Sequence, residues 1–148
     1  MYLPCTKRQA GFTLVELIIV IVALGVLTAY AVMKSVPAAE LTLPSQAQTL
    51  ASNIRHAQTL AYTTGRSLRL TITTGANGTY SVSCVTAGTC TQAFSVTLQK
   101  DVVLGGTSTV DFSTLGQPSG AASYTLSSGG ATETVSVAAL TGLVTVSP

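Results

Sequence analysis

Charged residues are scarce in this chain of 148 residues. They make up 8% of the sequence, against roughly a quarter in a typical soluble domain. Any surface outside a membrane must therefore be covered largely by Ser, Thr, Gln and Gly. The net charge is only +2, and removing Lys7 and Arg8 from the seven basic side chains leaves five, equal to the five acidic ones. This balance leaves no general electrostatic footprint for nucleic acid.

Residues that usually carry catalysis are also sparse. His56 is the only histidine, and neither an acidic orienter nor a nucleophile stands beside it in the sequence. The chain has no G-x-S-x-G, H-E-x-x-H, Walker or G-x-G-x-x-G motif. Nothing in the sequence places Asp101 and Asp111 as a catalytic pair. We therefore expect a protein that is not an enzyme and that holds no cofactor or metal.

One long apolar run lies near the N-terminus. No residue from Leu17 to Met33 carries a charge, and a helix over residues 12–33 would be about 33 Å long, enough to cross a hydrocarbon core of ~30 Å. Glu16, just before this run, needs a partner near a membrane. Cleavage after Gly11 would create an ammonium on Phe12, four positions before Glu16 and on the same side of a helix. Between two chains, this pair would remove isolated charges from lipid and set the axial register.

The same segment resembles the type IV prepilin signal and reads KRQAGFTLVELIIVIVALGVL. A short basic leader ends in Gly11, and Phe12, a Glu at the fifth mature position and an apolar helix follow. In that family an inner-membrane aspartyl prepilin peptidase cuts after the glycine and methylates the new N-terminal amine. The resemblance implies cleavage between Gly11 and Phe12, N-methylation of Phe12, and a role in assembly for the carboxylate of Glu16.

An ordinary secretory signal is the main alternative, with Lys7 and Arg8 as its basic region and Ala29-Tyr30-Ala31 as its cleavage site. A soluble adhesin or binding module would then begin at Val32. A plain signal anchor is a further alternative. Secretory signals have an apolar region of about 7 to 15 residues without acids, so the longer run behind Glu16 favours the prepilin interpretation. The basic flank predicts a cytoplasmic N-terminus.

Beyond the apolar run, the sequence predicts a helix followed by strands. Pro37 and Pro44 predict a kink or a break. Ser45 can then cap a helix over residues 45–64 that Gly65 ends. Its apolar residues recur at three- and four-residue spacing and form one face that can pack on a sheet: Leu50, Ile54, Ala57, Leu60 and Ala61.

From Arg66 onward, apolar and polar residues alternate with period two. Residues 68–72 and 80–84 predict a hairpin with its turn at 75–78. Further strands are predicted at 94–98, 102–104, 109–112, 124–127, 132–137 and 143–146, with glycine pairs at 105–106 and 129–130 between them. A helix laid against an antiparallel sheet is an α+β arrangement.

This arrangement also matches the pilin fold, in which a long N-terminal hydrophobic helix packs on a small antiparallel β-sheet domain. The expected organisation is a prepilin leader (1–11), a transmembrane polymerisation helix (12–36), a kink or linker (37–44) and a periplasmic domain (45–148) that is β-rich over 66–148.

Cys5 would leave with the leader, so the mature chain keeps Cys84 and Cys90. In an oxidising periplasm, an even pair separated by five residues, with Ala87-Gly88 as a turn, predicts a small disulfide loop. A metal site is the alternative. Two thiolates without a nearby His or carboxylate fall short of the four ligands that zinc requires.

Within the pilin superfamily, three segments carry a closer resemblance: LASNIRHAQTLAYTTGRSLRLTI, DFSTLGQPSG and ALTGLVTV. They are similar to parts of H-type minor pseudopilins of type II secretion, fimbrial T-type minor pilins and minor pilins of mannose-sensitive haemagglutinin type. The resemblance implies a minor, tip or initiating subunit of a type IV pilus or type II secretion pseudopilus. It implies as partners other pilins, the prepilin peptidase, the inner-membrane assembly platform and membrane lipid. Secretion, adhesion, motility and DNA uptake are all compatible with this sequence.

A weak basic patch could form from Arg55, Arg66, Arg69 and Lys100. Some T-type minor pilins that this chain resembles bind DNA during uptake, so an adhesin or DNA-binding role is an alternative. A dedicated DNA-binding subunit would be expected to carry a basic tail near its C-terminus, but this chain ends in TGLVTVSP, without charge. A few solvated arginine side chains are therefore the favoured interpretation.

Overall fold

The computed structural model describes residues 13–35, 38–86, 88, 90–99 and 101–148. The chain divides into two compact units, Met1–Val36 and Pro37–Pro148. The first contains helix α1, Leu14–Ser35. In the second, the described residues form helix α2, Ala38–Thr64, and nine strands in two antiparallel sheets. An α+β architecture is therefore confirmed.

Over residues 14–30, helix α1 carries apolar side chains on all sides, with Glu16 in its first turn. The described side chains of residues 14–30 are all exposed within the chain, and most of them are Leu, Ile or Val at consecutive positions. The Thr28 hydroxyl donates hydrogen bonds to the backbone carbonyls of Leu24 (3.0 Å) and Gly25 (2.9 Å). We predict a membrane span over 12–36 from the sequence. Within the described part of the chain, no helix has the length and apolar character needed to cross a membrane.

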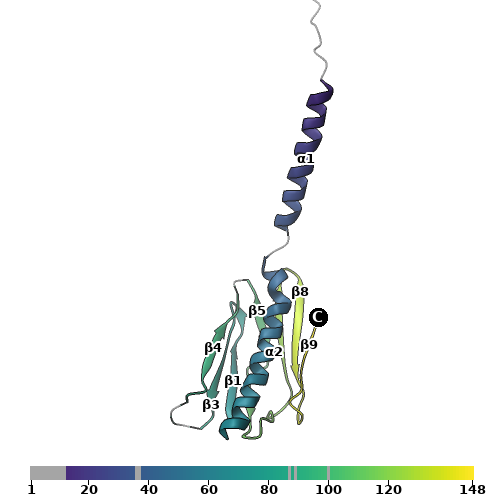
Figure 1. Ribbon diagram of the computed structural model, residues 1–148. Coiled ribbons are helices and arrows are strands. Elements are labelled where there is room, and N and C mark those ends of the chain that lie inside the picture. Colours follow the sequence, from purple (N-terminus) through teal and green to yellow (C-terminus); the bar gives the residue numbers. More distant parts are fainter. Residues whose placement is uncertain (1–12, 36–37, 87, 89, 100) are drawn as a thin grey trace, which may run out of the picture. The chain divides into compact units, whose positions relative to one another are not determined.

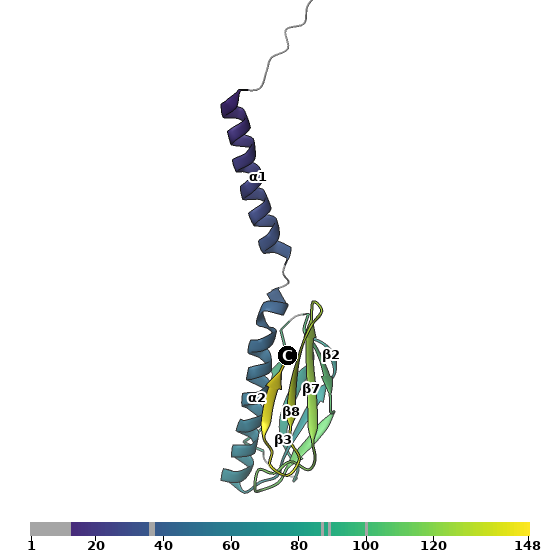
Figure 2. The same cartoon turned by 90° about the vertical axis from the view of Figure 1, so that its right-hand side faces the viewer.

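The strands of the second unit form two sheets rather than the single sheet predicted. The four-stranded sheet has the order β4–β3–β1–β6, from Phe94–Thr97, Thr79–Cys84, Leu68–Thr73 and Thr109–Phe112. The five-stranded sheet has the order β2–β5–β7–β8–β9, from Gly75–Ala76, Val103–Gly106, Ala122–Ser128, Ala131–Val137 and Val144–Ser147. Figures 1 and 2 show the sheets beside α2.

The predicted hairpin of β1 and β3 is present, with Leu70 opposite Val82. Its turn was predicted incompletely, because Gly75–Ala76 leaves the first sheet and pairs with β5 of the second. Gly105 and Gly106 lie inside β5 instead of separating strands. The reason is close approach: a Cβ on Gly106, whose φ is 120°, would collide with the carbonyl oxygen of Ser123 in β7.

Helix α2 runs through Pro44, where a kink or break was predicted. Buried Leu43 and Ala47 anchor it to the core on both sides of the proline, and this packing offsets the missing amide donor. Ser45 is therefore not an N-cap. Its hydroxyl instead donates to the carbonyl of Thr42 (2.7 Å) within the helix. Pro37 lies outside the described residues.

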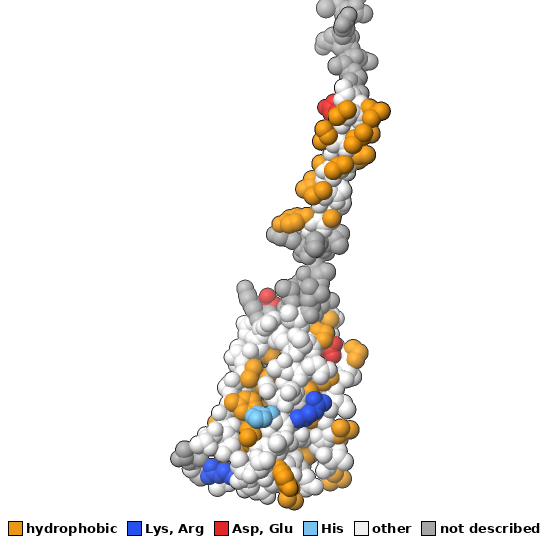
Figure 3. All heavy atoms as spheres, viewed as in Figure 1, with side chains coloured by type: hydrophobic (Ala, Val, Ile, Leu, Met, Phe, Trp, Pro, Cys, Tyr) orange, Lys and Arg blue, Asp and Glu red, His pale blue; other side chains and the backbone are white. Residues whose placement is uncertain are grey.

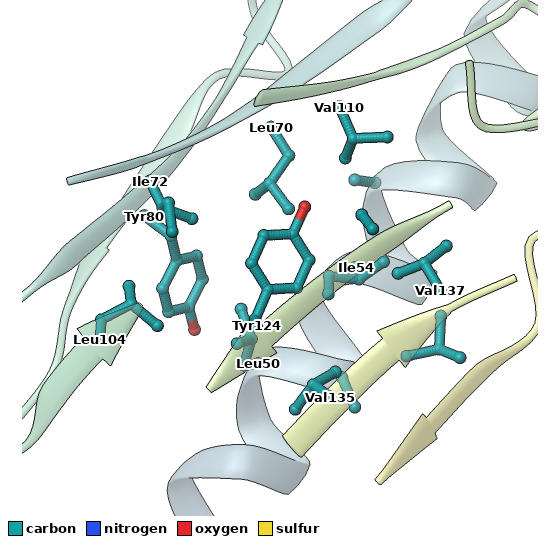
Figure 4. Close-up of a cluster of buried hydrophobic side chains, with 14 of the residues drawn as sticks. Leu50, Ile54, Leu70, Ile72, Tyr80, Leu104, Val110, Tyr124, Val135 and Val137 are labelled. Carbon is teal, nitrogen blue, oxygen red and sulfur yellow. The ribbon is translucent and has the colours of Figure 1, made fainter. Parts of the chain in front are cut away.

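The core lies where α2 meets both sheets. The buried positions of α2 follow a heptad-like spacing: Leu43, Ala47, Leu50, Ala51, Ile54, Ala57 and Ala61. This face contacts β7, β8 and β9 of one sheet and β1 and β6 of the other. Figure 4 shows Leu50 and Ile54 from α2 beside Tyr124 and Val135 from the five-stranded sheet. The predicted apolar face is confirmed, with Leu60 at its half-buried margin.

Two buried tyrosines differ in how their hydroxyls are satisfied. The Tyr80 hydroxyl accepts a hydrogen bond from Asn53 Nδ2 (2.7 Å). The Tyr124 hydroxyl is buried without a hydrogen-bond partner among the described residues. Burial raises the pKa of both phenols, that of Tyr124 far above its ordinary range, while the Asn53 bond partly offsets the rise at Tyr80. Both rings therefore stay neutral, and only one of the hydroxyls contributes a bond to stability.

Removing the hydroxyl of Tyr80 and removing that of Tyr124 should therefore change the free energy of unfolding differently. Tyr80→Phe should lower the free energy of unfolding by roughly 1 kcal/mol, since the Asn53 amide loses its acceptor. Tyr124→Phe should leave it unchanged or raise it by up to about 1 kcal/mol, since a desolvated polar group is removed. Urea denaturation of the full-length chain in detergent micelles, followed by circular dichroism, measures both. Equal destabilisation by the two substitutions would contradict this assignment.

Candidate functional site

The first turn of α1 contains the candidate assembly residue Glu16. Thr13 Oγ1 accepts a hydrogen bond from the Glu16 amide (3.2 Å), and the Leu17 amide donates to the Thr13 carbonyl (3.2 Å). Thr13 is therefore the N-cap of α1. Glu16 occupies the third helical position, where an acidic or amide side chain completes a capping box and complements the helix dipole. Gly11 and Phe12 lie outside the described residues.

Glu16 therefore has two separable properties: its charge and its position in the cap. A glutamine at the same position keeps the capacity to cap but removes the charge, whereas alanine removes both. The sequence carries the T-x-x-E signature of this cap over residues 13–16. The role of Thr13 could thus have been predicted, although we did not single it out from the sequence.

The predicted disulfide between Cys84 and Cys90 is present. Its sulfur atoms are 2.03 Å apart and its Cα atoms 5.7 Å apart. Cys84 is the last residue of β3 and packs at the margin of the core. The bond therefore ties the loop after β3 to the end of that strand. Both sulfurs are used in this bond, so neither is a thiolate available to a metal.

Of the four basic residues singled out from the sequence, the three arginines are described, and each of them has an interaction. Arg69 on β1 makes a bidentate ion pair with Asp111, directly opposite on β6 (2.6 and 2.7 Å). Arg55 donates to the carbonyl of Val144 (2.8 Å). Lys100 lies outside the described residues. On the face shown in Figure 3, the blue side chains lie apart from one another, and Arg66, which follows α2, also has an interaction of its own.

The Arg69–Asp111 ion pair shifts the pKa of both side chains. The hydrogen bond from Arg69 lowers the pKa of Asp111, partial burial opposes that shift, and the positive charge adds to it. The same hydrogen bond and the negative charge of Asp111 raise the pKa of Arg69. Because both side chains are partly exposed to solvent, the pair makes only a small contribution to stability.

His56 is exposed on α2, and its ring lies 5.9 Å from that of Phe94 in β4, at a tilt of 46°. This contact matches the surface role expected for a lone histidine. Figure 3 shows the pale blue histidine beside hydrophobic side chains. His56 therefore marks the point where α2 comes near the outer strand of the four-stranded sheet.

Side chains of α2 also hold the outer edge of β9. Gln58 Nε2 donates to the Gly142 carbonyl (2.7 Å), and Arg55 Nη2 donates to the Val144 carbonyl (2.8 Å). A Cβ on Gly142 would lie 2.6 Å from Gln58 Nε2, and one on Gly116 would lie 2.9 Å from the Gln58 backbone oxygen. Two loops thus pack closely around Gln58. Sequence reasoning missed this residue, because its partners are more than 50 positions away.

Comparison with known proteins identifies the N-terminal segment and the fold. Residues 6–32 match the family described as the prokaryotic N-terminal methylation motif, a stretch that includes Gly11, Phe12 and Glu16. No curated protein matches the chain.

Solved structures of two proteins resemble the fold. The type IV minor pilin FimU of Pseudomonas aeruginosa has a TM-score of 0.58 and 13% identity, covering 72% of this chain and 88% of that one. The minor pseudopilin EpsH of the Vibrio cholerae type 2 secretion system has a TM-score of 0.58 and 12% identity, covering 71% and 95%. A second crystal form of FimU gives a TM-score of 0.57.

The chain thus carries the methylation motif, and its fold is similar to that of solved minor pilins and pseudopilins. The resemblance stated from the sequence is confirmed at this level.

The Arg69–Asp111 pair should make stability depend on pH in a defined direction. A carboxyl whose pKa is lowered by folding stabilises the folded state above its unfolded pKa and loses that contribution as the pH falls through its folded pKa. Asp111→Asn should therefore be slightly less stable than wild type at neutral pH. The difference should begin to shrink as the pH falls toward 3.8, the ordinary pKa, and should vanish only below the lowered pKa of the folded state. Urea denaturation across this pH range measures the difference. A gap that stays constant into acid would contradict the ion-pair role.

Proposed function

We propose that this protein is a structural subunit of a type IV pilus or a type II secretion pseudopilus. The observation that carries the proposal is the methylation motif over residues 6–32, which leads directly into a helix with apolar side chains on all sides. The pilin-like fold of the second unit supports it. A structural role, rather than catalysis, also accounts for the shortage of catalytic side chains in the sequence.

Processing is the first step of the proposed function. A prepilin peptidase cuts between Gly11 and Phe12 and methylates the amine of Phe12. The leader with Lys7 and Arg8 stays on the cytoplasmic side until it is removed, and the second unit lies in the periplasm. The methylation motif supports the anchoring of the precursor in the inner membrane before assembly.

Assembly then has to cover α1. A helix that is apolar on all sides is stable only inside a protein or a membrane. Lipid covers α1 in the precursor, and the α1 helices of neighbouring subunits cover it in the filament. The assembly platform in the inner membrane mediates this transfer. The partners of α1 are thus the corresponding helices of other pilins or pseudopilins.

Glu16 sets the position of each incoming subunit. Its carboxylate lies in the first turn of α1 and pairs with the Phe12 ammonium of a subunit already in the filament. The pair removes two isolated charges from an apolar surrounding, where each costs up to about 3 kcal/mol. Only processing creates the ammonium, so unprocessed chains lack this pairing group.

Two observations support a minor rather than a major subunit. Both solved proteins described above are minor components, one of a type IV pilus and one of a type 2 secretion system. The resemblance of three sequence segments to minor pilins agrees with them. A DNA-binding role gains no support from Arg69 and Arg55, because the first is paired with Asp111 and the second is bound to backbone.

Processing predicts a definite mature mass. Intact-mass spectrometry of the protein from its native host should give a chain that begins at Phe12 and carries one methyl group, with the Cys84–Cys90 disulfide intact. A Gly11 substitution should block cleavage and leave the full precursor. A product that begins at Val32 would indicate an ordinary secretory signal and would refute the proposal.

The charge of Glu16 should be needed for incorporation but not for processing. Glu16→Gln, which keeps the capping capacity, should lower the amount of subunit in purified filaments about tenfold or more, since the ammonium loses its counter-charge in an apolar surrounding. Immunoblots of sheared filaments and of whole cells measure incorporation and expression.

Two variants give that comparison its controls. Glu16→Ala should behave like Glu16→Gln, and Glu133→Gln, which removes an acidic charge from β8, should be incorporated like wild type. Normal incorporation of Glu16→Gln together with failure of Glu16→Ala would assign Glu16 to helix capping instead.

A further inference from the structure

The outer edge of β4 presents unpaired backbone groups. The Leu98 amide donates to the carbonyl of Gly78, just before β3 (3.0 Å), and the register continues with Val96 and Phe94 bonded to β3. In an antiparallel ladder, alternate residues point their amides and carbonyls to opposite sides. Those of Ser95 and Thr97 therefore point away from the sheet. Within the described residues, these outward groups have no hydrogen-bond partner.

The next outward position along β4 is already covered. The Gln99 amide donates to Gln46 Oε1 of α2 (3.0 Å), so a side chain takes the place that a neighbouring strand would occupy. Gln46 Nε2 also approaches Gln99 Oε1 (3.5 Å). The edge is thus closed at Gln99 and open at the two preceding outward positions.

Parts of two other sheet edges in this unit are covered by the chain itself. The carbonyl of Gly142, just before β9, and the outward carbonyl of Val144 in β9 accept hydrogen bonds from α2. On β6, the Ser119 amide donates to the Asp111 carbonyl (2.7 Å), and Phe112 forms a bridge with Pro118. The open stretch of β4 contrasts with these covered positions.

A groove separates α2 from this open edge. A cavity of about 250 Å³ lies there, and its walls include Thr49 of α2 and Val96 and Thr97 of β4. Along the groove, side chains rather than backbone bridge helix and sheet, through the Asn53–Tyr80 hydrogen bond and the His56–Phe94 ring contact. Figure 1 shows β4 at the outer side of its sheet, on the opposite side of α2 from β9.

The sequence of this edge lacks the usual protection against strand pairing. Natural edge strands carry charges, prolines or bulges that prevent association. Residues 90–99 contain neither a charged residue nor a proline. Phe94 and Val96 are only partly buried against the core, so they offer apolar surface to an added strand.

We propose that the β4 edge accepts an extended, uncharged segment of a different pilin subunit as an additional strand. The backbone of that segment pairs with Ser95 and Thr97, and its apolar side chains cover Phe94 and Val96. A charged segment would be disfavoured, because none of the groove residues named above carries a fixed charge to compensate it. This inference rests on the proposed function, since it names a contact between filament subunits.

A second copy of this chain is not the partner that the geometry favours. Antiparallel pairing of two identical β4 strands is two-fold symmetric and reverses one subunit relative to the other. Subunits that enter a filament through the same N-terminal helix share one polarity. A different subunit, which presents a different segment, avoids this conflict.

Hydrogen exchange resolved to single residues tests the added strand. The full-length chain in detergent micelles is compared with the same chain in purified filaments. In filaments, exchange of the Ser95 and Thr97 amides should slow at least about tenfold, while the Phe94 and Val96 amides, already bonded to β3, should change little. Incorporation with unchanged exchange at Ser95 and Thr97 overturns the added strand but leaves the proposed function intact. Absence of the wild-type chain from filaments overturns both.

Two substitutions at one position separate backbone pairing from side-chain packing. Ser95→Pro removes the outward amide and spares the ladder to β3, and it should reduce incorporation about tenfold. Ser95→Ala keeps the amide and should be incorporated like wild type. Circular dichroism and the intact disulfide verify that Ser95→Pro is folded. A folded Ser95→Pro chain that is incorporated normally overturns the proposal.

A photo-crosslinking side chain at Thr97 identifies the partner in assembled filaments. The expected adduct is an uncharged segment of a second pilin, which mass spectrometry of the digested product locates. An adduct to β4 of another copy of this chain, or to a helix or a charged segment, overturns the assignment of the partner.

Discussion

The second unit depends on the packing of one face of α2 against both sheets at once. Alanines at 47, 51, 57 and 61 alternate with larger side chains such as Leu50 and Ile54, and all of them are buried. Small residues let the helix come close to the strands, and the larger ones fill the space between the sheets. Among the described residues of this unit, no other helix covers either sheet. Without α2, both would expose their apolar faces.

The borders of this face have a second role. Gln58 and Arg55 bind carbonyls of β9 on one side of α2, and Gln46 binds an amide at the end of β4 on the other. Polar side chains of α2 thus form hydrogen bonds with backbone groups at the outer edges of both sheets. The unequal coverage of the two sides follows from distance, because α2 contacts β9 directly, whereas a groove lies between α2 and β4.

The sequence predicted the strands well because apolar and polar residues alternate with little interruption. The β1–β3 hairpin and the later strands lie within a few residues of their predicted places. Their division into two sheets could not be read from the sequence, because it depends on which distant strands pair: β1 pairs with β6, whereas β5 pairs with β7. The kink or break predicted at Pro44 was wrong for a related reason. Tertiary packing of Leu43 and Ala47 outweighed the local helix-breaking preference of proline.

The residues of the candidate site likewise fall into two groups: those with a local sequence signal and those whose partners are distant in the sequence. Glu16 and the cysteine pair were recognisable because their signals are local: a short motif in one case, and close spacing in the other. The pairing of Arg69 with Asp111 and the docking of loops on Gln58 depend on residues brought together only by the fold. Long-range partners of this kind leave no spacing pattern in the chain.

The scarcity of charge, together with the mutual neutralisation of Arg69 and Asp111, has a consequence for the contacts that the second unit makes. Dissolved ions act on proteins mainly by screening exposed charges, and the second unit has few to screen. Contacts made by such a surface depend on shape, buried area and hydrogen bonds. Such contacts would change little between fresh water and brine.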